Sequence, residues 1–294
     1  MAAEEKEKKL AFLSAGERKK DETVGKFDGV LLATDYDDTF YSEEFGIARE
    51  SRAAVESFIA QGGHFVISTG RSLENFAIQI EREGLSMNSP AILSNGATVY
   101  DFANQKTLFA RKMRPEIITD MAEICAQFPA VGFEAYCGEG VYIHHPNQIT
   151  RCHLERAGLH GVERPIAAMP TPWTKAILQH EDVTLLLAAQ TYIQERWPND
   201  YEAIFSTTTL LEMTAKGSHK GSAILWLAEK LGVSRENIYA VGNGENDVPM
   251  LAVAARAFAP QNCADCLRDW GATILPNCED GCVASLIEWL ETRY

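Results

Sequence analysis

The sequence predicts an α/β fold in which a doubly wound parallel sheet is interrupted by a second α/β domain. Short apolar runs at residues 29–34, 64–67 and 237–241 predict strands that are buried on both faces. Val55, Phe58 and Ile59 stand at helical spacing between the first two runs. Alternating buried strands and amphipathic helices are typical of a parallel sheet covered on both sides.

The predicted core sheet is split by an insertion. We assign residues 27–111 and 207–294 to the core and residues 112–206 to the inserted domain. An insertion at this place is expected to form a cap over the carboxyl ends of the parallel strands, where open α/β sheets bind ligands. Within it the pattern predicts a helix over 115–128, strands over 131–136 and 141–145, a Pro-rich loop near 165–172, and then a strand, a helix and a strand up to 205.

Composition narrows the class of protein. A chain of 294 residues with 46% hydrophobic content can bury a sizeable core. The formal charge of −14 argues against nucleic acid or anionic membranes as general partners. No apolar run approaches the roughly 18 residues of a membrane span, and seven cysteines are expected to be reduced thiols, so we expect a cytoplasmic protein. Residues 1–26, rich in Glu and Lys, are expected to be a disordered or loosely helical tail.

A cluster of carboxylates, Asp35, Asp37 and Asp38, follows the first predicted strand directly. Like charges this close repel, so a divalent cation or a proton must neutralise part of the cluster, and oxygen-ligated Mg²⁺ is the expected cation. With Mg²⁺ bound, one aspartate could attack a phosphorus atom while the other moves the leaving-group proton. The alternative interpretation is an acidic turn that caps the next helix.

Three later segments carry complementary chemistry. The second strand ends in Thr69, Gly70 and Arg71, where a hydroxyl, a glycine amide and a guanidinium suit a phosphate. Residues 216–221 open a predicted helix after the apolar stretch at residues 210–213, which we take as a core strand, and one of the two lysines there can neutralise a bound phosphoryl group. Residues 242–247, after another predicted strand, supply further oxygen ligands.

In this order, the four segments resemble the motifs of the haloacid dehalogenase (HAD) superfamily, in particular its Cof-type phosphatases. Residues 277–281, before the last predicted helix, resemble the same group. The resemblance runs from about residue 29 to the end of the chain and is carried by the core motifs, whereas the insertion matches in size and element order. It implies a Rossmann-like HAD core with an inserted α/β cap.

The resemblance also implies residue roles. Asp35 would be the nucleophile that forms an aspartyl-phosphate, Asp37 the general acid and later the base, and Thr69 and Lys220 would bind and balance the phosphoryl group. Mg²⁺ would be held by Asp35, the backbone carbonyl of Asp37, and Asn243 or Asp247. The family usually has Asp where this chain has Asn243, so the choice between the last two stays open. The candidate substrate- and phosphate-binding residues are Tyr36, Gly70, Arg71, Asn95 and Asn246.

The predicted cap offers candidate contacts to the leaving group, namely Glu134, Tyr136, Tyr142, His144, Trp173 and Lys175. Packing is the alternative role for each of them. Two looser groups could bind a metal, although their spacing is irregular for zinc. One comprises Cys263, Cys266, Cys278 and Cys282, and the other Cys137, His144, His145, Cys152, His153 and His160.

These observations predict a Mg²⁺-dependent phosphomonoester hydrolase for a small phosphorylated metabolite, above all a sugar phosphate. One alternative is a phosphotransferase of the phosphohexomutase type, which uses the same aspartyl-phosphate. Another is a non-catalytic sensor of a phosphate ligand, which Asn243 would favour if metal binding had been lost. The sequence indicates no particular oligomeric state.

Overall fold

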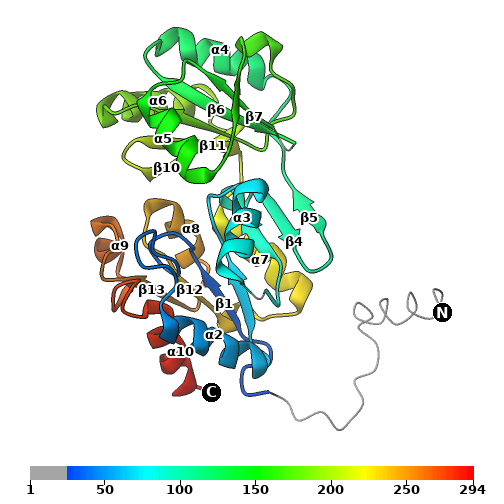
Figure 1. The fold of residues 1–294 in the computed structure, drawn as a ribbon, viewed down its shortest axis with the longest axis vertical. Helices are drawn as coiled ribbons and strands as arrows, with labels where there is room; N and C mark the ends of the chain where they lie inside the picture. Colours follow the sequence, from blue (N-terminus) through cyan, green and yellow to red (C-terminus); the bar gives the residue numbers. More distant parts are fainter. Residues whose placement is uncertain (1–24, 86, 139) are drawn as a thin grey trace, which may run out of the picture.

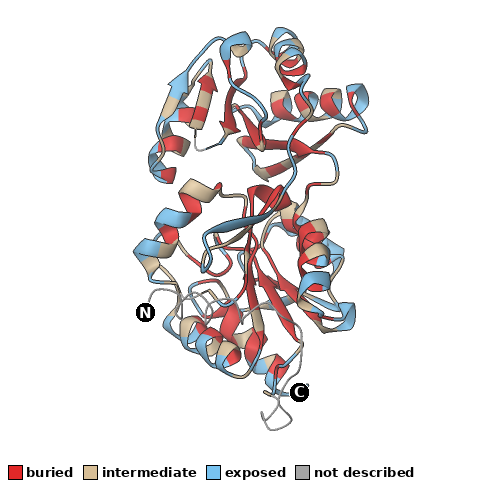
Figure 2. Cartoon of the chain, turned by 90° about the vertical axis from the view of Figure 1, so that its right-hand side faces the viewer, coloured by how far each residue is buried: buried red, intermediate tan, exposed pale blue. Residues whose placement is uncertain are grey.

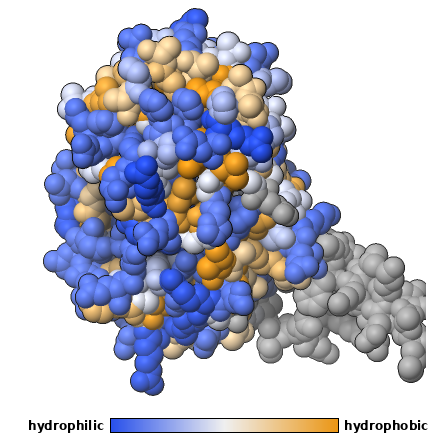
Figure 3. All heavy atoms as spheres, turned by 45° about the horizontal axis from the view of Figure 1, so that its top comes forward, coloured by the Kyte–Doolittle hydropathy of each residue, from blue (hydrophilic) through white to orange (hydrophobic). Residues whose placement is uncertain are grey.

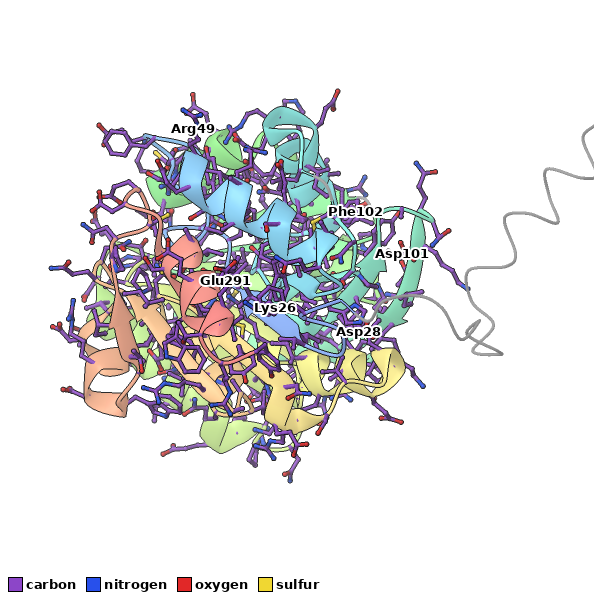
Figure 4. The ribbon with its side chains drawn as sticks, turned by 90° about the horizontal axis from the view of Figure 1, so that it is seen from below. Lys26, Asp28, Arg49, Asp101, Phe102 and Glu291 are labelled. Carbon is purple, nitrogen blue, oxygen red and sulfur yellow. The ribbon has the colours of Figure 1, made fainter. Side chains whose placement is uncertain are left out.

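The computed structural model describes residues 25–85, 87–138 and 140–294, and it confirms the predicted α/β fold with an inserted α/β part. The core occupies the lower half of Figure 1, and the insertion, coloured green, stands above it. Residues 1–24 of the predicted tail lie outside the described residues. The described chain starts at the base of the core, where the ammonium of Lys26 donates to the carbonyl of Glu291 at 2.9 Å (Figure 4).

The core sheet has five parallel strands in the order β14-β13-β12-β1-β2. The central strand β1 pairs with β2 on one side and β12 on the other, and all four of its residues are buried. This is why it appears in the sequence as an unbroken apolar run. The strands are β1 (Leu31–Thr34), β2 (His64–Ile67), β12 (Ile238–Val241), β13 (Arg256–Pro260) and β14 (Thr273–Leu275).

Helices cover both faces of this sheet, as the alternating pattern predicts. Side chains of α2, α3 and α10 form one hydrophobic cluster with the sheet, and side chains of α7, α8 and α9 form another on the opposite face. Figure 2 shows both clusters as buried layers against the strands. The helices are α2 (Arg49–Ala60), α3 (Leu73–Glu83), α7 (Lys220–Leu231), α8 (Val248–Leu251), α9 (Asp265–Trp270) and α10 (Cys282–Glu291).

A small antiparallel sheet, β3-β4-β5, joins the edge of the core. The backbone N–H of Thr69 donates to Ile92 at 2.8 Å and thereby links β2 to β3. The predicted alternation of strands and helices does not hold to the end of the first core segment, residues 27–111, because β4 and β5 pair directly as a hairpin. The strands are β3 (Ala91–Leu93), β4 (Thr98–Asp101) and β5 (Lys106–Ala110).

The cap is built on a six-stranded sheet in the order β10-β11-β9-β6-β7-β8. Its outer face packs on α4 and α6, and its inner face packs on α5. The helix α5 and strand β8 were not predicted. The elements are α4 (Ile117–Gln127), β6 (Gly132–Cys137), β7 (Gly140–His144), α5 (Gln148–Ala157), β8 (Gly161–Glu163), β9 (Lys175–Gln179), α6 (Val183–Arg196), β10 (Tyr201–Thr207) and β11 (Leu210–Ala215).

The second boundary of the insertion differs from the predicted one. The division between residues 206 and 207 falls inside the hairpin of β10 and β11, and β11 pairs with β9 in the cap sheet. Residues 210–213 are therefore part of a cap strand and not of a core strand, and we place the boundary after Ala215. All six residues of β11 are buried, so its apolar pattern resembles that of a central parallel strand.

Hydrophilic side chains predominate on the face seen when the top of Figure 1 is turned forward, and apolar side chains form smaller groups among them (Figure 3). Across the described part of the chain, no helix has the length and apolar character needed to cross a membrane.

Gly221 allows α7 to approach the core closely, and this contact yields a test of the fold. A Cβ atom at Gly221 would overlap the carbonyl oxygen of Pro249, whereas Gly232, the left-handed cap at the other end of α7, has open space around it. We expect Gly221→Ala to lower the free energy of unfolding by about 2 kcal/mol or more, because backbone atoms must shift. Gly232→Ala should cost about 1 kcal/mol, because only the positive φ is strained. Urea unfolding of both variants checks this, and equal losses would contradict the close approach.

Candidate active site

Asp35 lies at the carboxyl end of the central strand. Its backbone N–H donates to the carbonyl of Val241 at 2.9 Å, which ties the end of β1 to the end of β12. The residue is 6% exposed, and its carboxylate lines a cavity between core and cap. The strand ends of a parallel sheet thus place this carboxylate where ligands bind.

Lys220 lies behind Asp35 and is fully buried. Its ammonium donates at 2.6 Å to Oδ1 of Asp35 and at 2.6 Å to Oδ1 of Asp247. It is the first residue of α7, and the preceding His219 caps that helix by accepting the N–H of Ser222 at 3.1 Å. The helix start therefore fixes the lysine between two carboxylates.

Asp247 is fully buried, and both of its oxygens have partners. Oδ1 accepts from Lys220, while Oδ2 accepts the backbone N–H groups of Asn243 and Gly244 at 2.9 and 3.0 Å. A Cβ atom at Gly242 would overlap this carboxyl group, so the loop after β12 needs glycine there. Asp247 holds the loop and the lysine, and it does not line the cavity.

Asn243 does line the cavity, together with Asp35 and Asp37. Its Oδ1 accepts the hydroxyl of Thr39 at 3.2 Å, and its backbone carbonyl accepts the N–H of Ala264 at 2.8 Å. Of the two predicted alternatives for a metal ligand, the amide of Asn243 is therefore the one that faces the open space.

Asp37 and Arg71 form a bidentate pair at the cavity wall. The guanidinium donates to Asp37 at 2.7 and 2.9 Å and to Oδ1 of Asn75 at 2.5 Å. The Asp37 side chain is 45% exposed and that of Arg71 18% exposed, so solvent and ligands reach the pair. Both residues lie at the site, where the guanidinium of Arg71 is hydrogen-bonded to both carboxylate oxygens of Asp37.

The loop after β2 is held against its neighbours by hydrogen bonds. The hydroxyl of Thr69 accepts the N–H of Arg71 at 3.1 Å, and the carbonyl of Thr69 accepts the N–H of Asn95 at 3.1 Å. The side-chain oxygen of Asn95 accepts from the amide of Asn246 at 3.1 Å, which links this loop to the one after β12. Thr69 and Asn95 are buried, whereas Gly70, Arg71 and Asn246 line the cavity.

Tyr36 differs from its predicted place. Its ring is fully buried and stacks on Tyr41 with centroids 5.0 Å apart, in the cluster that contains Phe76. The side chain does not line the cavity, so only its backbone could contact a ligand. Side chains at alternate positions of an extended segment point to opposite sides, which turns Tyr36 inward between two aspartates that face the cavity.

The cavity has a volume of about 270 Å³ and lies between the two parts of the molecule. The cap side is formed by side chains of β6, α5, β9 and the β10–β11 hairpin. These side chains include Tyr136, His153, Arg156, Lys175 and Glu212.

Of the predicted cap contacts, Tyr136 and Lys175 line the cavity, and Glu134 is buried behind them. The ammonium of Lys175 donates to the carbonyl of Gly70 at 2.7 Å and to Glu212 at 3.3 Å, and so it joins cap to core. Trp173 is fully buried in the outer layer of the cap.

Tyr142 and His144 contact other cap residues and do not line the cavity: Arg164 lies over the ring of Tyr142, and the His144 ring stacks on His145. The cavity is also lined by His153, Arg156 and Glu212, which the sequence pattern did not predict there. Asn147 and Gly158, which cap α5 at its two ends, are the signal that could have revealed the helix that carries the first two.

Burial and like charges make the Asp35 carboxylate costly to ionise. The pKa of Asp35 is raised to about 8: burial is the largest cause, the carboxylates of Asp247 and Asp37 also raise it, and Lys220 lowers it. A divalent cation beside Asp35 would supply the missing positive charge. The oxygens of Asp35, Asp37 and Asn243, with backbone carbonyls and water, match the hard ligands that Mg²⁺ prefers.

The looser cysteine and histidine groups have no comparable geometry. All seven cysteines are free thiols. Among residues 25–85, 87–138 and 140–294, no three His, Cys, Asp or Glu side chains converge as a metal centre, so Mg²⁺ would depend on amide, carbonyl and water oxygens as well as carboxylates.

The raised pKa of Asp35 predicts how pH affects stability in metal-free protein. The unfolded chain loses this proton near pH 4 and the folded chain near pH 8, so the wild-type fold loses stability between these values as the pH rises. Asp35→Asn cannot ionise, and we expect it to exceed wild type by more than about 1 kcal/mol at pH 8.5, with a smaller gap at pH 5.5.

Urea unfolding in a chelator at both pH values measures this gap. Added Mg²⁺ should reduce it, and Asp269→Asn, at an exposed position, should show no such pH dependence. A gap that is constant or shrinks as the pH rises would contradict the prediction.

Comparisons with known proteins agree with this geometry. Residues 32–287 match the family described as haloacid dehalogenase-like hydrolase. A putative phosphatase of Streptococcus pyogenes is 28% identical over 88% of this chain and 98% of its own length. The 5-amino-6-(5-phospho-D-ribitylamino)uracil phosphatase YcsE of Bacillus subtilis is 26% identical over 88% and 95%. The solved structure of BT4131, described as a sugar phosphatase of HAD subclass IIB, superposes with a TM-score of 0.78 at 18% identity, covering 89% of this chain and 99% of that one. The chain thus belongs to the haloacid dehalogenase-like hydrolase family, and it carries an inserted α/β cap.

Proposed function

We propose that the protein is a Mg²⁺-dependent phosphomonoester hydrolase that acts on a small phosphorylated metabolite of the sugar-phosphate class through an aspartyl-phosphate. The observation that carries this proposal is the environment of Asp35. One carboxylate oxygen is held by the buried ammonium of Lys220, and the carboxylate borders a cavity that the cap closes from above.

In the first step, a carboxylate oxygen of Asp35 attacks the phosphorus, and the bond from phosphorus to the leaving oxygen breaks. The departing oxygen takes a proton from Asp37, which leaves an alcohol, an aspartyl-phosphate and an ionised Asp37. In the second step, Asp37 takes a proton from water, the resulting hydroxide attacks phosphorus, and Asp35 leaves as a carboxylate. Inorganic phosphate and the original enzyme are the products.

Asp37 must be released before it can perform either proton transfer. Both of its oxygens accept from Arg71 in this state. A bound phosphoryl group offers the guanidinium an alternative acceptor of equal geometry. Substrate binding would thus turn Arg71 from Asp37 to the phosphate and free one carboxylate oxygen for the proton.

Mg²⁺ would be held by Asp35, the backbone carbonyl of Asp37 and the amide oxygen of Asn243, with Asp247 fixing the loop behind them. When bound, the ion screens the charges of the carboxylates and of the phosphoryl group that approaches them. Thr69 would hydrogen-bond the phosphoryl oxygens. Gly70 precedes Arg71 in its loop, and hydrogen bonds through Asn95 and Asn246 hold that loop against its neighbours.

The proposed substrate class has two supports. Relatives named above are phosphatases of a ribitylamino-uracil phosphate and of sugar phosphates, which are small metabolites. The cavity of about 270 Å³ has room for a ligand of that size. We also propose a cytoplasmic location, which the free thiols support.

Hydrolysis of a panel of phosphorylated sugars, polyols, cofactors and nucleotides tests this function. We expect Mg²⁺-dependent release of phosphate from members of the sugar class, and none from Asp35→Asn. Mass spectrometry of protein quenched during turnover should find phosphate on Asp35. Phosphate on another residue would overturn the assignment. Conversion of a hexose 1-phosphate to the 6-phosphate without free phosphate would indicate a phosphotransferase instead.

Asn243 provides a second test, which concerns the metal. Asn243→Asp adds a negative charge at the cavity, and Thr39 can donate to the new carboxylate as well as to the amide. One unit charge at about 4 Å is worth up to about 4 kcal/mol at an effective dielectric of 20, and repulsion from Asp35 and Asp37 cancels much of it. We expect about tenfold tighter binding of Mg²⁺, measured by calorimetry.

Asn246→Asp is the matched control, because it adds the same charge three residues away in the same loop. Its effect on Mg²⁺ affinity should be clearly smaller. An equal gain in Mg²⁺ affinity for both variants would mean that the added charge attracts the ion from a distance and that residue 243 is not a ligand.

A further inference from the structure

The inner face of the cap sheet is unusually polar for a buried surface. Glu134, Ile177 and Glu212 stand side by side in register on β6, β9 and β11, and the two glutamates are buried. The outer face of the same strands carries the apolar side chains of the cap core. The buried carboxylates Glu134 and Glu212 therefore both lie on the face of the sheet that is turned to the cavity, although burying a charge is costly.

Glu134 is the most enclosed of these groups, at 0% exposure. Its carboxylate accepts from Tyr136 Oη at 2.7 Å, from Gln179 Nε2 at 2.6 Å and from His153 Nδ1 at 2.9 and 3.0 Å. Three donors around one carboxylate hold its charge in place. Two of the three, Tyr136 and His153, also line the cavity.

The network determines the tautomer of His153. An ionised carboxylate only accepts hydrogen bonds, so Nδ1 of His153 carries a hydrogen and donates it to Glu134. In the neutral ring Nε2 then bears a lone pair and is a hydrogen-bond acceptor. No residue of the described chain bonds Nε2, and the side chain is 19% exposed to the cavity that it lines.

A donor accompanies this acceptor. Arg156 is three residues further along α5, so it projects from the same side of the helix, and it also lines the cavity. It has no ion-pair partner among the described residues. An acceptor and a donor side by side match a hydroxyl group, which donates one hydrogen bond and accepts another.

We propose that His153 and Arg156 form a subsite for hydroxyl groups of the leaving group, with Nε2 of His153 as the acceptor and Glu134 as the positioning residue. This inference rests on the proposed phosphatase function and narrows it to polyhydroxylated leaving groups, sugars or polyols. The phosphoryl group lies against Asp35 and Arg71 in the core, and the hydroxyl-bearing part extends to α5 in the cap.

The test compares substrates with and without the hydroxyls. His153→Asn keeps a donor for Glu134 but removes the Nε2 acceptor. For the best sugar or polyol phosphate of the panel we expect KM to rise about five- to tenfold with kcat little changed. Phenyl phosphate, which has no hydroxyl on its leaving group, should be hydrolysed by wild type and variant with equal KM. His160→Asn, at an exposed position outside the cavity, is the matched control and should change neither.

A series of monodeoxy analogues sharpens the assignment. The analogue that lacks the recognised hydroxyl should already have the raised KM in wild type and show no further rise in His153→Asn. Glu134→Gln should raise KM for the same hydroxylated substrates and leave phenyl phosphate unaffected, and its effect should be non-additive with that of His153→Asn.

Several outcomes would overturn the proposal. Equal losses on phenyl phosphate and on the sugar phosphate would show a structural role for the network, as would a Glu134→Gln variant whose thermal stability falls while KM is constant. A best substrate without hydroxyls would overturn the subsite and leave the phosphatase function standing. Absence of phosphate release from every substrate would instead contradict the proposed function itself.

Discussion

The buried ammonium of Lys220 is the interaction on which the site depends. It donates to Asp35 and to Asp247; Lys220 and Asp247 are fully buried, and Asp35 is buried except where it borders the cavity. Charges in this environment are tolerated only when their partners are in place, so none of the three can move without exposing the others to a large cost. Asp247 in turn holds the two N–H groups that shape the loop of Asn243. One lysine thereby connects the end of β1, the start of α7 and the loop after β12.

The same arrangement leaves an excess of negative charge at the side of the site that borders the cavity. Asp35, Asp37 and Asp247 face two cations, Lys220 and Arg71. Burial prevents water from compensating for the remaining negative charge, which is why the pKa of Asp35 rises. A site with this balance attracts a divalent cation, and the cation together with Arg71 then attracts a dianionic phosphoryl group. The folded protein alone therefore has an excess of negative charge at the site, which a bound cation would balance.

The sequence predicted the part of the site that follows local rules. Asp35, Thr69 and Asn243 each lie within two residues of the end of a strand, and parallel strands bring their carboxyl ends together, so their proximity follows from order alone. Residues whose position depends on long-range packing were harder to predict. Tyr36 points inward although both its neighbours in the motif face the cavity. The strand β11 has the apolar pattern of a core strand but pairs within the cap, and periodicity does not identify a strand's partners.

Core and cap use buried charge in different ways. In the core, Lys220 bonds two carboxylates directly, and this rigid triad supports a reaction at phosphorus that is the same for every substrate. In the cap, Glu134 and Glu212 are also buried, but each is paired with a side chain that reaches the cavity, His153 for one and Lys175 for the other. Lys175 continues to the carbonyl of Gly70, beside the loop that positions Arg71. The two cap carboxylates thus orient His153 and Lys175 toward the leaving group and the core loop. Substitutions on the inner face of the cap sheet can therefore alter which substrate fits while the phosphoryl chemistry stays intact.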